Sequence, residues 1–333
     1  MLYIKVQKVC AEILRGNLIK RGFLSTEDKI IRDDSYIYLP LNEYARENIK
    51  SLSGEGLGMI ELNKTASYRK PLPLGIGYDL FGNIAIIDAK RKMLNTEATR
   101  SAGRKIIALN PRVTTVLEKS GPVQGQFRIR KLGFVCGKRR FIAEYSENGA
   151  RFVFDVRKVF FSARLAYERA RIAALVKNGE IVAVPFAGVG PFPIVIAKRA
   201  KPSSIIAIEL NKAAWAYMEK NIRLNKTSCI HAICGDFKAV ADRHIGIADR
   251  VIMQMPTQSM DFIEPMLKIA KEKGKAHVYL FCNAKKVKCV KDGIRKELGS
   301  FGYRTKFIFE RIVRTYSKAE VEMVFDISFS KVG

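Results

Sequence analysis

Short apolar runs alternate with amphipathic stretches throughout the second half of the 333-residue chain. Five of these runs are EIVAVP, SIIAIEL, IHAICG, RVIMQMP and AHVYLFC. Apolar runs of this length, separated by helical stretches, predict a parallel, doubly wound α/β sheet. Asn211 is a suitable cap for one of the helices, over residues 212–224. The last two strand-like runs, YRTKFIFERIVRTY and EVEMVFDISF, have only SKA between them, which predicts a terminal antiparallel hairpin.

The first half of the chain divides into smaller parts. Residues 1–65 read as a small α/β module, with a strand (LYIKV), a helix (CAEILRGNLIKRG) and a strand-like run (IIRDDSYIYLPL). Residues 66–75, ASYRKPLPLG, have the composition of a linker. Residues 76–171 combine a hairpin (YDLFGNIAIID), a threonine-capped helix (NTEATRSAGRKIIAL) and three further strand-like runs, which predicts an α+β middle domain. The doubly wound domain then spans residues 172–333.

The charge of the chain favours a polyanionic partner. Fifty-nine Lys and Arg face 32 Asp and Glu, which gives a formal net charge of +27. Basic proteins gain affinity for nucleic acid because each neutralised phosphate releases a condensed counterion. Between Arg128 and Arg171, twelve Lys and Arg stand against four acids. This concentration indicates a surface for nucleic acid.

Several other classes of protein do not fit the sequence. No apolar run reaches the roughly eighteen residues of a membrane span, and the N-terminus lacks the apolar core of a signal peptide. We therefore expect a soluble, cytoplasmic protein. The six cysteines form no CxxC pair and the chain has only three histidines, so we expect no metal site.

A glycine turn at residues 187–191, AGVGP, follows the first run of the doubly wound domain. Gly188 and Gly190 allow the backbone to approach a ligand closely, but the third glycine of a nicotinamide fingerprint is replaced by Pro193. Glu209 ends the next run and can accept hydrogen bonds from a ribose diol. After the third run, Asp236 can hold an adenine amino group, and the aromatic residue after it can cover the base. Together these features favour S-adenosylmethionine over NAD as the ligand.

The segment KVFFSARLAYERAR at residues 158–171, followed closely by FAGVGPF, resembles the archaeal and eukaryotic tRNA (guanine-37) N1-methyltransferase family, which includes relatives in wyosine biosynthesis. The resemblance covers essentially the whole chain, including GQFRIRKL in the middle domain and RIVRTYS near the end. It implies a class I (Rossmann-like) methyltransferase sheet with a terminal antiparallel hairpin, an α+β middle domain and a small N-terminal α/β module. It also implies a monomer that binds tRNA at the anticodon loop.

The resemblance assigns roles to individual residues. The general base that removes the proton from guanine N1 falls on Glu168, and the arginine that stabilises the charge on O6 falls on Arg128. An amide that helps to fix the target base falls on Gln254. The donor would contact Phe186, Ala187, Gly188, Val189, Gly190, Glu209, Leu210, Asp236, Phe237, Gln254 and Arg164. The RNA-binding residues would be Lys138, Arg139, Arg140, Arg169 and Arg171.

Three positions depart from the family pattern. Val184 stands where the strand before the glycine turn carries an acid, and Gln254-Met255-Pro256 replaces an Asn-Leu-Pro triplet. Phe160 replaces a common tyrosine. Because a longer amide changes the geometry around the target base, methylation of carbon 7 of 4-demethylwyosine at the same tRNA position remains an alternative. A non-catalytic RNA-binding protein with a degenerate donor pocket is the third reading.

Overall fold

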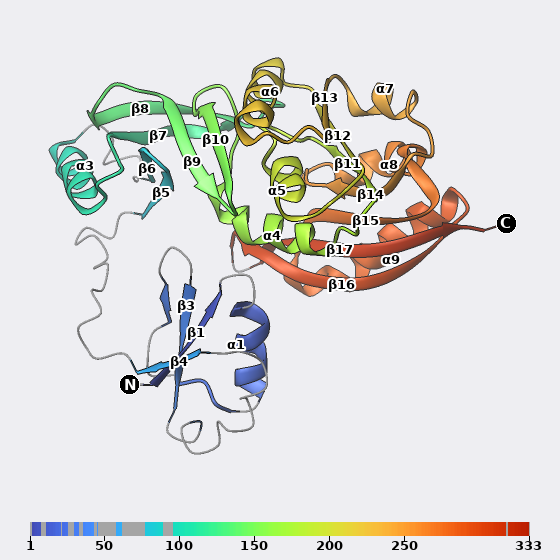
Figure 1. Cartoon of the computed structure of the whole chain (residues 1–333), viewed down its shortest axis with the longest axis horizontal. Coiled ribbons are helices and arrows are strands. Elements are labelled where there is room, and N and C mark those ends of the chain that lie inside the picture. The colour runs from blue at the N-terminus through green and yellow to red at the C-terminus, as the bar shows by residue number, and fades with distance from the viewer. Residues whose placement is uncertain are drawn as a thin grey trace. The chain divides into compact units, whose positions relative to one another are not determined.

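The computed structural model divides the chain into two compact units, Met1–Pro73 and Leu74–Gly333 (Figure 1). The structure describes residues 2–7, 11–20, 22–25, 30–32, 36–42, 45, 58–61, 77–88, 96–317 and 319–332. The predicted linker at residues 66–75 lies outside these ranges.

The first unit is an antiparallel sheet with one helix. The strands pair in the order β2-β3-β1-β4. Ile4 and Val6 from β1 pack against Leu14 and Leu18 from the helix. The strand, helix and strand predicted here are found in the same order. The elements are β1 (Leu2–Gln7), α1 (Ala11–Lys20), β2 (Ile31–Arg32), β3 (Tyr36–Leu41) and β4 (Gly58–Glu61).

The second unit begins with a four-stranded sheet in the order β5-β6-β7-β8. The predicted hairpin is β5 with β6, and the predicted helix is α3, whose cap Thr96 accepts a hydrogen bond from the Thr99 N–H at 3.3 Å. Strand β7 was not predicted, because Gly121 and Pro122 within it resemble a turn. The elements are β5 (Gly77–Phe81), β6 (Ile84–Asp88), α3 (Glu97–Leu109), β7 (Thr115–Gln124) and β8 (Ile129–Gly137).

The next hairpin and helix join this sheet to the rest of the unit. Strands β9 (Ile142–Glu147) and β10 (Ala150–Asp155) pair with each other, and a short 3-10 turn, η3 (Ala163–Leu165), leads into helix α4 (Ala166–Leu175). The predicted boundary between residues 171 and 172 therefore falls inside a helix. Ile86 and Leu117 of the middle sheet belong to the same buried cluster as Ile172 of α4 and Val182. One core spans both regions.

A seven-stranded sheet forms the remainder, in the order β13-β12-β11-β14-β15-β17-β16. The first five strands in that order are parallel, and β17 runs antiparallel to both β15 and β16. The predicted parallel sheet and terminal hairpin are confirmed. The strands are β11 (Ile181–Pro185), β12 (Ser204–Glu209), β13 (Ile230–Cys234), β14 (Ala248–Met253), β15 (Ala270–Asn283), β16 (Tyr303–Thr315) and β17 (Glu320–Lys331).

Helices cover both faces of this sheet (Figure 1). Buried residues of α4, α5 and α6 form one apolar cluster with the strands, and those of α7, α8 and α9 form a second. The predicted cap Asn211 accepts hydrogen bonds from the N–H groups of Ala213 and Ala214 at the start of α6. The elements are α5 (Pro191–Arg199), α6 (Lys212–Asn225), α7 (Phe237–Ala241), η4 (Ser259–Phe262), α8 (Ile263–Ile269), η5 (Ala284–Lys286) and α9 (Val287–Ser300).

Two further observations concern only the residues that the structure describes. None of their helices has the length and apolar character needed to cross a membrane. No three of their His, Cys, Asp or Glu side chains gather in a group able to hold a metal ion.

Candidate active site

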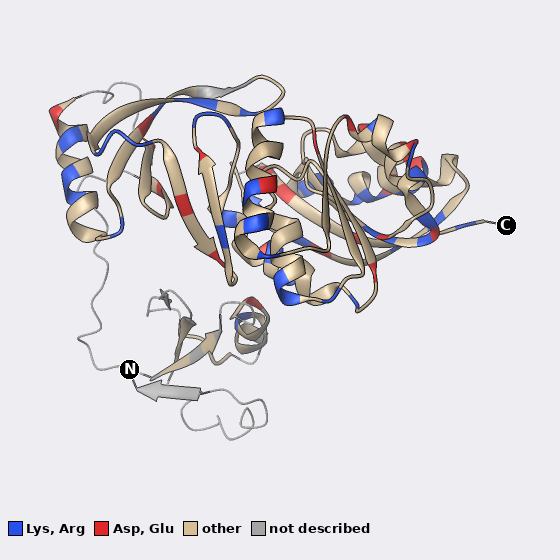
Figure 2. Cartoon of the chain, turned by 45° about the horizontal axis from the view of Figure 1, so that its top comes forward, with Lys and Arg blue, Asp and Glu red and all other residues tan. Residues whose placement is uncertain are grey.

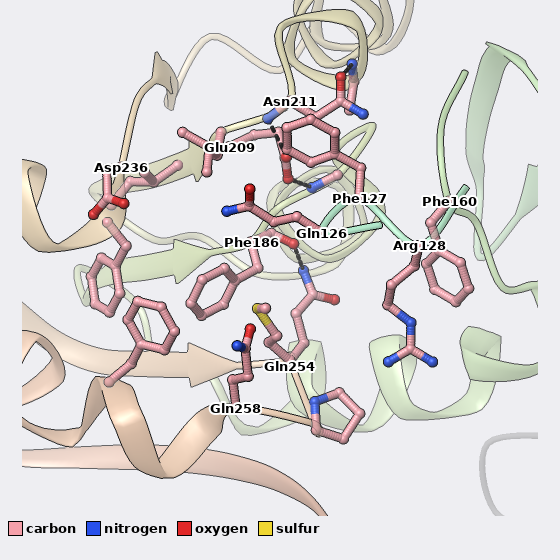
Figure 3. A pocket seen from close by; sticks show the side chains of 18 of the residues that line it. Gln126, Phe127, Arg128, Phe160, Phe186, Glu209, Asn211, Asp236, Gln254 and Gln258 are labelled. Carbon is pink, nitrogen blue, oxygen red and sulfur yellow. Dashed lines mark hydrogen bonds between the residues drawn. The ribbon is translucent and has the colours of Figure 1, made fainter. Parts of the chain in front are cut away.

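A cavity of about 260 Å³ opens where the parallel strands end. Residues at or just after the ends of β11, β12, β13 and β14 line it, which is where open α/β sheets bind ligands. Figure 3 shows Asp236 at one side of the cavity, Arg128 and Phe160 at the other, and Gln254 between them. Seven predicted donor contacts line the cavity, namely Phe186, Gly188, Glu209, Leu210, Asp236, Phe237 and Gln254. Four do not, namely Ala187, Val189, Gly190 and Arg164.

The backbone of the glycine turn follows an unusual path. Phe186, Gly188 and Gly190 have positive φ angles of 58°, 59° and 86°. Glycine adopts this conformation without strain, whereas Phe186 does so at a cost that the surrounding structure must offset. A side chain at Gly190 would also lie 3.0 Å from Cγ of Met218 and 3.1 Å from Cδ1 of Ile194. The turn therefore needs glycine at this position.

Glu209 links the end of β12 to the glycine turn. Its carboxylate accepts hydrogen bonds from the backbone N–H groups of Gly188 and Asn211, each at 2.7 Å (Figure 3). Burial raises the pKa of Glu209, although the backbone N–H groups act in the opposite direction. Each oxygen keeps a second lone pair for a hydroxyl group. The geometry suits the recognition of a ribose diol.

Aromatic rings and an acid define the adjoining part of the cavity. The ring of Phe186 lies 4.8 Å from that of Phe262 and 5.8 Å from that of Phe237, edge to face in both cases. Asp236 is exposed and caps α7 by accepting the Lys238 N–H at 2.7 Å. Apolar ring surface beside a carboxylate suits a purine with an exocyclic amino group.

The Gln254 amide is fixed against the glycine turn. Its Nε2 donates to the carbonyl oxygen of Phe186 at 2.9 Å (Figure 3). The same carbonyl belongs to the residue with the strained backbone. The other amide atom, Oε1, accepts no hydrogen bond from the described residues and is available to a ligand.

Arg128 enters the cavity from the tip of the β7–β8 hairpin. Its backbone is left-handed, with φ 53°, and its N–H donates to the Gly125 carbonyl at 3.1 Å, which closes the turn. The guanidinium carbon lies 5.3 Å from the ring centre of Phe160 and 5.9 Å from that of Phe281. Its buried Nε has no hydrogen-bond partner among the described residues. Arg128 is thus a cation free to serve a ligand.

Residues not predicted as site residues complete this side of the cavity. Gln126 and Phe127 come from the same hairpin tip as Arg128. Arg314 of β16 and Glu322 of β17 also line the cavity, and Nε of Arg314 donates to Oε2 of Glu322 at 2.8 Å. The GQFRIR and RIVRTYS segments carried three of these residues in the sequence, but alternation alone does not tell which side chains face a ligand.

Glu168 lies outside the lining of the cavity. Its carboxylate is 2% exposed and accepts hydrogen bonds from the Tyr279 hydroxyl and from Nε of Arg171, each at 3.0 Å. Nε of Arg311 lies 3.3 Å from its other oxygen. This second oxygen, Oε1, accepts no hydrogen bond from the described residues. The general-base role of Glu168 stays a prediction, and it requires the buried carboxylate to move toward the cavity.

Three arginines that the sequence assigns to ligands are paired with carboxylates of the protein instead. Arg164 donates twice to Asp79 of β5 and lines a neighbouring cavity, so it does not contact the donor cavity. Arg169 is 1% exposed and bonds the carboxylate of Glu147 with two nitrogens. The predicted RNA contact by Arg169 is therefore corrected to a buried ion pair. Arg171 is likewise held, by Glu168 and by Asp326 at 2.6 Å.

The basic loop at residues 138–140 is exposed, as an RNA contact requires. The guanidinium of Arg139 lies 5.8 Å from the ring centre of Phe134, and Arg140 pairs with Glu144. Helix α3 presents further exposed cations, Arg100, Arg104 and Lys105 (Figure 2).

Comparison with known proteins places this site in a family. Residues 143–298 match the TRM5/TYW2 methyltransferase domain, and residues 4–49 match the tRNA methyltransferase 5 N-terminal domain. The chain is 31% identical to the tRNA (guanine(37)-N(1))-methyltransferase Trm5b of Pyrococcus abyssi, over 99% of each chain. The crystal structure of Trm5b from Pyrococcus abyssi superposes with a TM-score of 0.71 over 99% of both chains, at 29% identity. The chain belongs to the TRM5/TYW2 methyltransferase family.

Two more TRM5/TYW2 relatives bear on the substrate. A complex of aTrm5 with tRNALeu has a TM-score of 0.67 at 28% identity, and the match covers 98% of this chain and 99% of that one. The tRNA 4-demethylwyosine(37)-methyltransferase Taw21 of Saccharolobus solfataricus is 31% identical over 75% of this chain and 92% of its own length. The predicted family, the methyltransferase activity and the class I methyltransferase fold are confirmed.

One departure from the TRM5/TYW2 pattern has a structural explanation. Val184 is fully buried in β11, where both faces of the sheet are covered by helices. An acid at this position would be desolvated, so the valine stabilises the core while it removes a carboxylate near the glycine turn.

Proposed function

We propose that this chain transfers the methyl group of S-adenosylmethionine to N1 of guanosine 37 in tRNA. The observation that carries the proposal is the composition of one cavity. One side presents the nucleoside-binding features, Glu209 and Asp236. The other side presents Arg128, a cation with no ion-pair partner among the described residues, beside the ring of Phe160. A donor nucleoside and a target base would meet across Gln254.

The donor half holds its ligand by shape and hydrogen bonds. Glu209 receives the ribose hydroxyls, and the rings near Phe186 cover the adenine. S-adenosylmethionine supplies a sulfonium methyl, so that the C–S bond breaks as the N1–C bond forms and a neutral thioether leaves. The fixed glycine turn sets the position from which that methyl faces the target.

The target half would handle the charge that develops on guanine. Loss of the N1 proton moves negative charge onto O6, and the Arg128 guanidinium stabilises that charge in this proposal. Phe160 offers a ring on which the base can stack. Glu168 takes the N1 proton in this proposal. Catalytic hydrogen bonds often form only in the substrate complex, so the paired state of Glu168 is compatible with that role.

The RNA would approach along the middle sheet. Guanosine 37 lies in the anticodon loop and must leave the base stack to reach the donor. The exposed cations at residues 138–140 and on α3 would contact phosphates and add a salt-dependent component to the affinity. We further propose that the chain acts as a monomer in the cytoplasm.

Methylation of carbon 7 of 4-demethylwyosine is the second candidate. It is favoured by the Gln254 amide in place of the family's asparagine and by the similarity to Taw21. The decisive experiment incubates the protein with labelled S-adenosylmethionine and tRNA carrying either guanosine or 4-demethylwyosine at position 37, and then identifies the labelled nucleoside. We expect 1-methylguanosine. Label on carbon 7 alone would replace the proposal, and no donor binding in calorimetry would favour a non-catalytic RNA-binding protein.

Donor binding is expected to weaken in mild acid. The ionised Glu209 is the form that accepts ribose hydroxyls, and its pKa is raised above the ordinary value of 4.5 by burial. Affinity is therefore full above the raised pKa and falls as the pH drops through it, which starts at a higher pH than for an ordinary glutamate. Calorimetric titration with S-adenosylmethionine between pH 8 and pH 5 measures this. The Glu209→Gln variant should bind weakly at every pH, and a variant that binds as tightly as the wild type would contradict the assignment.

A further inference from the structure

Glu322 is the acid on the target side of the cavity. Of the described residues that line the cavity, three are acids, and Glu209 and Asp236 both belong to the donor side. Glu322 is 2% exposed and lies on β17, opposite Phe281 of β15 and Arg314 of β16. A buried carboxylate needs charged or hydrogen-bonding partners, so the use of each of its oxygens has to be accounted for.

The protein satisfies one oxygen of this carboxylate. Nε and Nη2 of Arg314 both lie 2.8 Å from Oε2, and the Tyr316 hydroxyl is 3.5 Å from the same atom. Arg314 is itself held, because its Nη1 donates to Oγ of Ser162 at 3.3 Å. The other oxygen, Oε1, accepts no hydrogen bond from the part of the chain that the structure describes. Glu322 is therefore a fixed acceptor, bonded to a guanidinium on one side and with a free oxygen in a ligand cavity.

The hydrogen-bonding groups along one edge of guanine are complementary to Arg128 and Glu322. Along that edge O6 accepts, the central N1 carries one proton, and the exocyclic 2-amino group donates. Arg128 supplies a donor and Glu322 supplies an acceptor in the same half of the cavity. The Arg128 guanidinium lies 5.9 Å from the ring centre of Phe281, and Phe281 pairs directly with Glu322 across β15 and β17. If O6 lies at the cation and the amino group at the carboxylate, N1 lies between them, and neither flanking contact occupies it.

We infer that Glu322 determines specificity for guanine by accepting a hydrogen bond from the 2-amino group of the target base, with Arg314 as its positioning residue. This inference rests on the proposed function. It adds a contact to the base that Arg128 does not supply, because Arg128 lies at the O6 side of the base. A base without a free 2-amino group would leave the buried carboxylate unpaired, which weakens its binding and transfer.

The experiment compares tRNA with guanosine 37 and tRNA with inosine 37, which lacks only the 2-amino group. We expect the wild-type kcat/KM to favour guanosine by roughly 10- to 100-fold, as for loss of a hydrogen bond to a charged group. In Glu322→Ala the ratio should fall to within about threefold of unity, and in Glu322→Gln it should be intermediate. Each ratio compares two substrates on the same enzyme preparation, so a reduced fraction of folded enzyme lowers both values equally and leaves the ratio unchanged. Donor affinity measured by calorimetry should be unchanged.

Two control variants make the result specific. Glu320→Gln changes an exposed acid two residues earlier on the same strand and should keep the wild-type ratio. Gln254→Ala tests the other available acceptor in the cavity. The inference is overturned if Glu322→Ala discriminates as the wild type does, if Gln254→Ala alone abolishes discrimination, or if the wild type does not discriminate. Absence of any wild-type methylation of guanosine 37 would instead refute the proposed function.

Discussion

Replacement of Arg128 by alanine is expected to lower kcat by about 100- to 1,000-fold, the usual cost of removing one donor that stabilises a developing oxyanion. The guanidinium is held over Phe160 and Phe281, and its buried Nε has no partner in the described chain. The guanidinium is therefore already positioned, and its Nε is available to donate a hydrogen bond. Because the negative charge on O6 grows as N1 is deprotonated, the loss should fall on kcat more than on KM.

Single-turnover kinetics with saturating S-adenosylmethionine and tRNA measure this effect. Arg130→Ala is the matched control, since Arg130 comes from the same hairpin but lines the neighbouring cavity and not the donor cavity. It should change kcat by less than a few fold. Arg128→Lys should recover part of the activity, because lysine restores the charge without the planar fork. A normal kcat with a raised KM would make Arg128 a binding residue and contradict the assignment.

The donor half of this site could be predicted from the sequence because its determinants are local. The glycine turn, Glu209 and Asp236 each follow an apolar run, and the carboxyl ends of parallel strands meet at one edge of a sheet. The same is true of the helix cap at Asn211. In each case the local structure depends on residues that are close together in the chain, so the spacing of these residues in the sequence predicts it.

The target half depended on long-range pairing that the sequence does not reveal. Arg169 and Arg171 read as an exposed basic edge, but their partners Glu147 and Asp326 come from β9 and β17. Arg314 lies opposite Glu322 because the register of β16 shifts between Ile312 and Arg314. A bulge of this kind changes which side chains face the cavity, and alternation alone cannot place it.

Replacement of Glu168 is expected to have two separable effects. Its buried carboxylate balances Arg171 and Arg311 and accepts the Tyr279 hydroxyl, whose pKa is raised by burial and by this same carboxylate. Removing one partner of a buried ion pair costs about 3–5 kcal/mol. Glu168→Ala should lose about that much free energy of unfolding in urea titrations, and Glu168→Gln should lose less because the amide oxygen still accepts from Tyr279.

The catalytic effect is tested with Glu168→Gln below its unfolding temperature. If Glu168 removes the N1 proton, kcat should fall by about 100- to 10,000-fold, the usual contribution of a general base. Donor and tRNA affinities should stay within a few fold of the wild type.

Glu147→Gln separates this role from a structural one, because Glu147 is an equally buried partner of Arg169 that does not line the cavity. It should lower stability and leave kcat and the pH–rate profile intact. Glu168 accepts a hydrogen bond from the Tyr279 hydroxyl. Tyr279 pairs with Val324, and this pair lies two residues along the strands from the Phe281–Glu322 pair, which is about 7 Å by the rise of a strand. Glu168 must therefore move to reach a base in the cavity, and normal turnover by Glu168→Gln would refute its role as the general base.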